Sequence, residues 1–283
     1  MNSLTTQHKK VIRHGLRVVD HVLFYTLALL TVAPFVWMIL TSFKDMSEIF
    51  VYPPKWLPSR LHFENYERAF QAAPFGRYYL NSLFVAFSVT LGQLITCSMA
   101  AYAFARMKFP GRDLLFYIFL GTMMIPFHVT MIPSFIILHT LGWIDHYQAL
   151  IVPGLASAFG TFLLRQFFLT IPKELEEAAS LDGAGRFRIL WQIIIPLAKP
   201  ALATLAIFTF MGVFNDFIWA LVVINSEEMR TVQLGLAIFR DRHVTEWELL
   251  MAGSVTATLP ILIVFFSAQK YFIKGIALSG LKE

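Results

Sequence analysis

The chain has 283 residues, of which 57% are hydrophobic and 14% are charged, and its mean hydropathy is +0.63. This composition lies outside the usual range of soluble domains and indicates an integral membrane protein. The single cysteine, Cys97, excludes a disulfide within the chain and gives no support to a thiolate metal site. The net charge of +5 comes from loops that lack the interleaved aromatic residues of a nucleic-acid-binding surface.

Membrane spans are predicted from six apolar stretches. Each can cross the hydrocarbon core, which is about 30 Å thick and takes about 20 helical residues. The first stretch is not a secretory signal peptide, because it is too long and no small-x-small cleavage site closes it. The sequence therefore predicts an all-α integral membrane protein with six transmembrane helices. The predicted spans are residues 20–41, 80–105, 114–138, 149–169, 200–224 and 251–273.

The distribution of lysine and arginine predicts which ends of the spans face the cytoplasm. Fifteen of the 23 basic residues fall on the side that holds the N-terminal arm, the second and fourth connections and the C-terminal end. We therefore expect both termini in the cytoplasm, with residues 274–283 as a short tail. Residues 1–19 suit an interfacial helix and a disordered tail about equally.

Along the chain, several residues suggest helix ends or interruptions. The first span is followed by a proline-rich segment and a short amphipathic piece, Glu64 to Phe70, suited to the headgroup level. Gln93 falls near the middle of the second span. Pro126 and Pro133 in the third span each lack an amide proton, so backbone carbonyls are left that neighbours or water must satisfy. Such interruptions suit either a helix that lines a cavity or a simple packing kink.

The fifth span carries an intramembrane carboxylate, Asp216. An unpaired aspartate in hydrocarbon costs about 2.5–3.5 kcal/mol on insertion scales, so it must face protein, a partner or water. We predict that Asp216, its neighbours Asn215 and Trp219, and Gln93 line the substrate pathway. The alternative is that they form hydrogen bonds between helices. The following loop, 225–250, is acidic on balance and suits either a partner protein or solvent.

Residues 172–198, which we call the elbow, form a charge-rich connection on the predicted cytoplasmic side. Pro172 suits the first turn of a helix, and three carboxylates follow where the helix dipole favours negative charge. They are Glu174, Glu176 and Glu177. Gly183 then accepts a positive φ at low cost, and a second helical run over 186–195 ends at Pro196. The pattern predicts helix, sharp turn, helix.

The elbow resembles the EAA coupling motif of ABC-importer permeases. The matching residues are Glu177, Ala178, Ala179, Asp182, Gly183, Ala184, Phe187, Pro196 and Pro200. Ile195 stands where the family commonly has leucine. The end of the chain also resembles the Gly-x-x-x-x-Gly-x-Lys ending of carbohydrate permeases, although Glu283 stands where glycine is usual.

From Ser42-Phe43-Lys44 to the tail, the chain resembles the six-span permease subunit of maltose-type carbohydrate ABC importers. The resemblance implies a type I ABC importer permease fold in a bacterial or archaeal cytoplasmic (inner) membrane. It also implies assembly with a second permease subunit, two cytoplasmic ATPase subunits and an extracytoplasmic sugar-binding protein. By the same resemblance, the elbow residues from Glu177 to Pro196 named above couple this chain to the ATPase.

The chain lacks the motifs of an enzyme. It has no Gly-x-x-x-x-Gly-Lys-Ser/Thr phosphate loop, no His-Glu-x-x-His, no Gly-x-Ser-x-Gly and no cysteine cluster. We therefore expect no catalytic residue, no metal site and no cofactor on this chain, with ATP and Mg bound by the partner ATPase. Membrane lipid is an expected partner and nucleic acid is not.

Two other classes of protein stay open. A secondary transporter would work from an ion gradient, although the intramembrane carboxylates are few and inverted repeats are not evident. A membrane scaffold or sensor subunit would transport nothing, and its elbow would be an amphipathic helix pair without a partner. The sequence does not identify the sugar, and relatives in the resembled family also handle glycerol phosphate.

Overall fold

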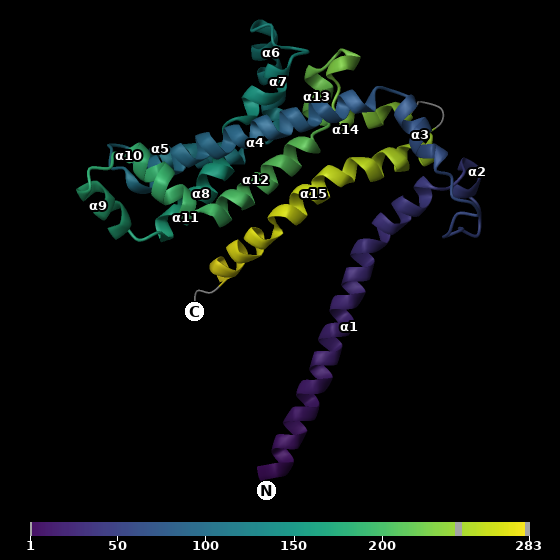
Figure 1. Ribbon diagram of the computed structural model, residues 1–283, viewed down its shortest axis with the longest axis horizontal. Helices are drawn as coiled ribbons and strands as arrows, with labels where there is room; N and C mark the ends of the chain where they lie inside the picture. Colours follow the sequence, from purple (N-terminus) through teal and green to yellow (C-terminus); the bar gives the residue numbers. More distant parts are fainter. Residues whose placement is uncertain (1, 241–244, 281–283) are drawn as a thin grey trace. The chain divides into compact units, whose positions relative to one another are not determined.

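The computed structural model describes the backbone of residues 2–240 and 245–280 (Figure 1). The chain divides into two compact units. The first unit comprises Met1–Ala69 and Phe239–Val255, and the second comprises Phe70–Ile238 and Thr256–Glu283. Within the described residues every regular element is helical, apart from one isolated β-bridge between Arg240 and Thr245. The predicted all-α fold is therefore confirmed.

In the first unit, hydrogen bonds connect the end of the long helix α1 (Asn2–Ser42) to a short helix that follows it in the chain. The amphipathic piece predicted at residues 64–70 forms α3 (Glu64–Gln71). The buried side chain of Asn65 donates hydrogen bonds to the carbonyls of Ser42 at 3.0 Å and Lys44 at 2.9 Å. These bonds satisfy carbonyls at the end of α1 and attach α3 there. The unit also holds α2 (Met46–Ile49) and the start of α15 (Trp247–Gly280).

Four largely helical stretches among the described residues are long and apolar enough to cross a membrane. They are Val19–Ser42, Phe75–Arg106, Tyr147–Thr170 and Trp247–Lys270. Two further helix pairs meet the same test but are bent. Arg112–Met124 and Phe127–Thr140 meet at 100°, and Arg186–Leu197 and Lys199–Phe214 meet at 82°. Counting each bent pair as one span gives six.

Proline explains the first of these bends. α5 (Arg112–Gly121) continues into the short helix η1 (Thr122–Met124), and α6 (Phe127–Thr140) begins after Pro126. Ile125 is extended, with φ −83° and ψ 116°, as expected of a residue before proline. The predicted interruption at Pro126 is confirmed. Pro133, by contrast, lies inside α6 without ending it.

The predicted stretches 149–169 and 200–224 are not continuous helices. The first consists of α7 (Tyr147–Ile151), η2 (Val152–Gly154) and α8 (Ala158–Thr170). The second consists of α12 (Lys199–Phe214) and α13 (Ile218–Val223). Each break leaves backbone groups without helical partners, and side chains satisfy some of them. The Ser157 hydroxyl, for example, accepts a hydrogen bond from the amide of Gly160 at 3.0 Å.

The second unit is built around α4 (Phe75–Arg106), which packs against α8 and α12. A glycine permits this close approach. An added Cβ on Gly160 of α8 would lie 2.9 Å from Leu205 Cδ1 on α12 and 3.0 Å from Cys97 Sγ on α4. Small residues allow helix backbones in a membrane to approach closely in this way.

The loop before residue 240 is also fixed to α4. The buried Asn81 side chain donates hydrogen bonds to the carbonyls of Glu228 at 2.8 Å and Arg230 at 2.9 Å. Glu228 lies in η4 (Glu227–Met229) and Arg230 directly follows it, and α14 (Val232–Leu236) and η5 (Ala237–Phe239) come next. The first half of the loop 225–250 is therefore anchored rather than free in solvent, while residues 241–244 lie outside the described residues.

Candidate functional site

The elbow begins with α9 (Glu174–Leu181), whose first turn contains all three predicted carboxylates. The expectation that Pro172 lies in that turn is wrong, because the helix begins two residues later with Lys173 as its N-cap. Ile171 is extended, with φ −75° and ψ 132°, as the residue before a proline prefers. Pro172 therefore separates α8 from α9 instead of starting a helix.

The predicted sharp turn is a Schellman C-cap. Gly183 has φ +80°, its amide donates to the carbonyl of Ser180 at 3.1 Å, and the amide of Ala184 donates to the carbonyl of Ala179 at 2.9 Å. These two bonds satisfy carbonyls that the end of α9 leaves open. The turn explains why a glycine stands at position 183, since other residues rarely adopt a positive φ.

The second elbow helix is longer than predicted. α10 (Arg186–Ile189) continues through a π-helical turn, η3 (Leu190–Ile194), into α11 (Ile195–Leu197). The expectation that the helix ends at Pro196 is therefore wrong. Pro196 lies within this continuous run, directly after the π-helical turn, and does not end it. The helical direction changes only at Ala198, before α12.

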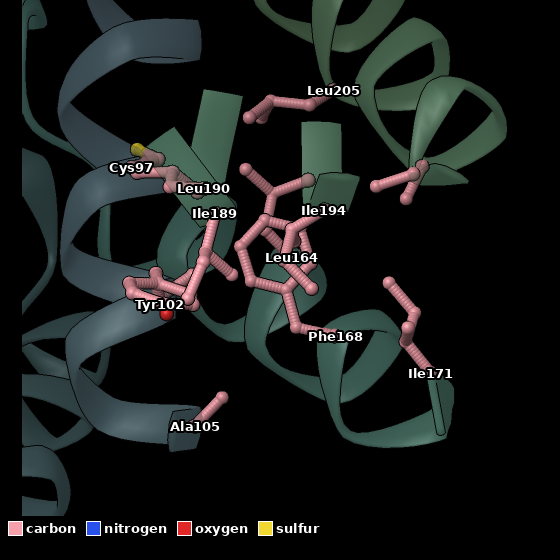
Figure 2. Packing of buried hydrophobic residues seen from close by; sticks show 13 residues of the cluster. Cys97, Tyr102, Ala105, Leu164, Phe168, Ile171, Ile189, Leu190, Ile194 and Leu205 are labelled. Carbon is pink, nitrogen blue, oxygen red and sulfur yellow. The ribbon is translucent and has the colours of Figure 1, made fainter. Parts of the chain in front are cut away.

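One side of the elbow packs against the membrane helices. Figure 2 shows Ile189, Leu190 and Ile194 of the elbow beside Tyr102 of α4 and Phe168 of α8. All five side chains are buried. Two motif residues, Ala179 and Ala184, pack against the same cluster. The inner side of the elbow is thus part of the hydrophobic core of the second unit.

The other side of the elbow is open. Leu181 is 90% exposed and Phe187 is 68% exposed, and both are large apolar residues. Glu177, Ala178 and Asp182 are exposed as well. Exposed apolar residues gathered beside charged ones are typical of a protein-binding surface. The sequence singled out Phe187 but not Leu181, although Leu181 directly precedes the predicted turn and could have been found by that position.

The predicted pathway residue Gln93 lies at a junction of three elements. Its amide nitrogen donates to the carbonyl of Gly154 at 2.7 Å, and its amide oxygen accepts from the Thr209 hydroxyl at 2.9 Å. Gln93 and Thr209 also line a cavity of about 230 Å³. The other lining residues are Ser157, Phe159, Phe208, Gly212 and Val213. Gln93 therefore combines a structural role with access to a cavity.

The other three predicted pathway residues lie elsewhere. Asn215 follows the last residue of α12, and its side-chain oxygen accepts from the Gln233 side chain at 3.1 Å. Asp216 accepts from the backbone amide of Trp219 at 3.1 Å and so caps α13. The Trp219 ring is buried, and its Nε1 donates to the carbonyl of Ala149 at 2.9 Å. None of the three lines the cavity beside Gln93, and their place in a pathway stays a prediction.

The elbow and most of the second unit match a known protein family. Residues 94–278 match the family described as "Binding-protein-dependent transport system inner membrane component". The elbow lies inside this match.

Among the described residues, no group of three or more His, Cys, Asp or Glu side chains is arranged to hold a metal ion.

Similar proteins extend the match to nearly the whole chain. The probable ABC transporter permease protein YurM of Bacillus subtilis is 36% identical over 263 residues, which cover 92% of this chain and 87% of YurM. The sn-glycerol-3-phosphate transport system permease protein UgpE of Yersinia pestis is 33% identical over 272 residues, which cover 93% of this chain and 97% of UgpE.

The fold agrees with this relationship. A chain in the crystal structure of a bacterial ABC transporter that imports the acidic polysaccharide alginate superposes with a TM-score of 0.81. The two chains are 29% identical, and the superposition covers 92% of this chain and 97% of the other. We conclude that the chain belongs to the family of inner membrane components of binding-protein-dependent transport systems, the permease subunits of ABC importers.

Proposed function

We propose that this permease forms half of the translocation pathway of an ATP-driven importer and receives its driving force through the elbow. The observation that carries the proposal is the two-sided character of the elbow. Its inner side is part of the helix core, whereas its outer side exposes Leu181, Phe187 and Glu177. A partner that binds the outer side can therefore move the packed membrane helices.

ATP hydrolysis then belongs to a separate subunit. The chain contains no phosphate-binding loop, so ATP and Mg bind two ATPase subunits in the cytoplasm. The elbow and both termini face the cytoplasm, and the protein crosses the inner membrane six times. A second permease subunit completes the pathway, and an extracytoplasmic binding protein delivers the substrate.

The proposed substrate is a sugar or a sugar-related solute. UgpE is named for sn-glycerol-3-phosphate, and the similar crystal structure is that of an alginate importer. Both solutes are rich in hydroxyl groups and carry negative charge. Gln93, Ser157 and Thr209 around the small cavity offer uncharged hydrogen-bonding groups suited to hydroxyls.

Reconstitution tests this function directly. We expect uptake into proteoliposomes only when the full assembly, the binding protein and internal ATP are present. Uptake by this chain alone under a proton or sodium gradient would contradict the proposal and identify a secondary transporter. Absence of uptake by the complete, ATP-hydrolysing assembly with each sugar bound by the binding protein would instead point to a scaffold or sensor subunit.

The role of Gln93 in the pathway can be tested by cysteine accessibility. In a Cys97→Ala background, we expect Gln93→Cys to react faster with a water-soluble thiol reagent while the importer hydrolyses ATP. Val89, one helical turn away on α4 and fully buried, provides the control as Val89→Cys. Equal protection of both positions in every nucleotide state would show that Gln93 does not meet the aqueous pathway.

A further inference from the structure

A buried arginine lies where α4, α8 and the elbow meet. Arg106 is the last residue of α4, and its side chain is 4% exposed. One terminal nitrogen, Nη2, donates to the carbonyls of Phe168 at 2.6 Å and Ile171 at 2.5 Å. Both carbonyls lie at the end of α8, where the helix dipole favours a positive charge. Arg106 therefore attaches the end of α4 to the end of α8.

The same guanidinium also contacts the first turn of α9. Its Nε lies 2.8 Å from Oε1 of Glu176, whose side chain is 14% exposed. The Nε–H bond is not aligned with that oxygen, so the contact is an ion pair rather than a linear hydrogen bond. The second carboxylate oxygen, Oε2, accepts a hydrogen bond from the Tyr102 hydroxyl of α4 at 3.3 Å. Glu176 thus binds two side chains of α4.

Glu176 differs in this respect from the other carboxylates of the same turn. Glu174 and Glu177 are exposed, whereas Glu176 faces the membrane helices. Removing one partner of a largely buried ion pair leaves the other charge uncompensated, so the pair constrains the position of α9 strongly. Only Ile171, Pro172 and Lys173 connect α8 to α9 along the chain.

The second elbow helix is held in another way, because Ile189, Leu190 and Ile194 are buried in the hydrophobic cluster with α4 and α8. α9, by contrast, has no buried residue, so the contacts of Glu176 with Arg106 and Tyr102 are the polar contacts that fix α9 to the membrane helices.

We propose that Arg106 and Glu176 are positioning residues for energy coupling. Their ion pair and the hydrogen bond from the Tyr102 hydroxyl to Glu176, which together we call the clamp, fix α9 to α4 and α8. A displacement of the elbow therefore moves both membrane helices together. The source of that displacement rests on the proposed function, because it is the ATPase that would move the elbow. The clamp itself is a property of this chain.

A distance measurement tests the clamp independently of transport. Spin labels are placed at Ser180→Cys in α9 and Phe162→Cys in α8, in a Cys97→Ala background, within the assembled importer in lipid nanodiscs. We expect Glu176→Gln, which keeps the size of the side chain but removes its charge, to broaden the distance distribution. Glu174→Gln on the same helical turn is the matched control and should leave the width unchanged. Equal widths in the two variants would overturn the clamp.

Transport then tests the consequence for coupling. We expect Glu176→Gln to lower the number of substrate molecules imported per ATP hydrolysed by about tenfold, with normal assembly. Glu174→Gln should keep the original ratio. A broadened distance distribution with an unchanged ratio would overturn the positioning role. If Gly183→Val also leaves the number of substrate molecules imported per ATP unchanged, the elbow does not couple ATP hydrolysis to transport. That result would refute the proposed function of the elbow and not the clamp.

A second variant covers the case in which Glu176→Gln does not assemble. Arg106→Lys keeps the positive charge, but a single ammonium group cannot replace the planar fork that reaches α8 and Glu176 together. We expect this variant to assemble and to show a broadened distance distribution with a reduced transport ratio. A distribution as narrow as that of the original protein would contradict the proposal.

Discussion

Replacing Gly183 with valine is expected to abolish ATP-driven uptake while the protein still inserts into the membrane and ATP hydrolysis continues. Gly183 has φ +80°, and an added Cβ would meet no atom within 4 Å. The cost is therefore backbone strain rather than a clash. It amounts to about 1–2 kcal/mol for an ordinary residue and more for a β-branched one. The turn should relax to another geometry and rotate α9 away from its position.

The neighbouring glycine provides a matched control for this prediction. Gly185 has φ −71°, which any residue adopts, and an added Cβ there also meets open space. Gly185→Val should therefore transport normally, and Gly183→Asn should lie between the two, because asparagine tolerates a positive φ better than valine. Uptake and ATP hydrolysis measured in the same proteoliposomes check this order. Normal coupling in Gly183→Val would refute the proposed role of the elbow.

Features with a local physical cause could be predicted from the sequence. Apolar length sets the membrane helices, because about 20 residues are needed to cross the bilayer. The turn after α9 follows from Gly183, since glycine is the usual residue at this position of a helix C-cap. The carboxylates of the first turn of α9 likewise mark the start of a helix. Each of these signals lies within a few residues of the structure that it predicts.

Features that depend on distant partners could not be predicted. Glu174, Glu176 and Glu177 look alike in the sequence, and only Glu176 meets Arg106, seventy residues earlier in the chain. The sequence contains one signal that separates Glu176 from the other two carboxylates. Glu176 lies three residues before Ala179, and residues at this spacing share a side of a helix. Ala179 packs against the hydrophobic cluster, so Glu176 faces the same way. Asp216 shows a similar limit, because its intramembrane charge predicts only that it needs a partner, and the structure shows that one of its oxygens accepts a hydrogen bond from the amide of Trp219.

The prediction with the largest expected effect on stability concerns Phe168 in α8. Its side chain is fully buried in the cluster that joins α4, α8 and the elbow (Figure 2). In water-soluble proteins, replacing a buried phenylalanine with alanine costs about 3–5 kcal/mol, part of which is the transfer of the ring out of water. Lipid is as apolar as the ring, so the contribution from transfer out of water is smaller in a membrane. The contribution from lost packing contacts remains.

We therefore expect Phe168→Ala to destabilise the protein by about 2–4 kcal/mol, through the cavity that it leaves beneath the elbow. Phe162, on the same helix, is 38% exposed and provides the control, because Phe162→Ala leaves a space that lipid can fill. Thermal unfolding of the two purified variants in the same detergent measures the difference. Similar unfolding temperatures would contradict the prediction and mean that the Phe168 ring adds little to the stability of the protein. A large shift for Phe168→Ala alone would show that packing in this cluster, which joins α4, α8 and the elbow, stabilises the protein.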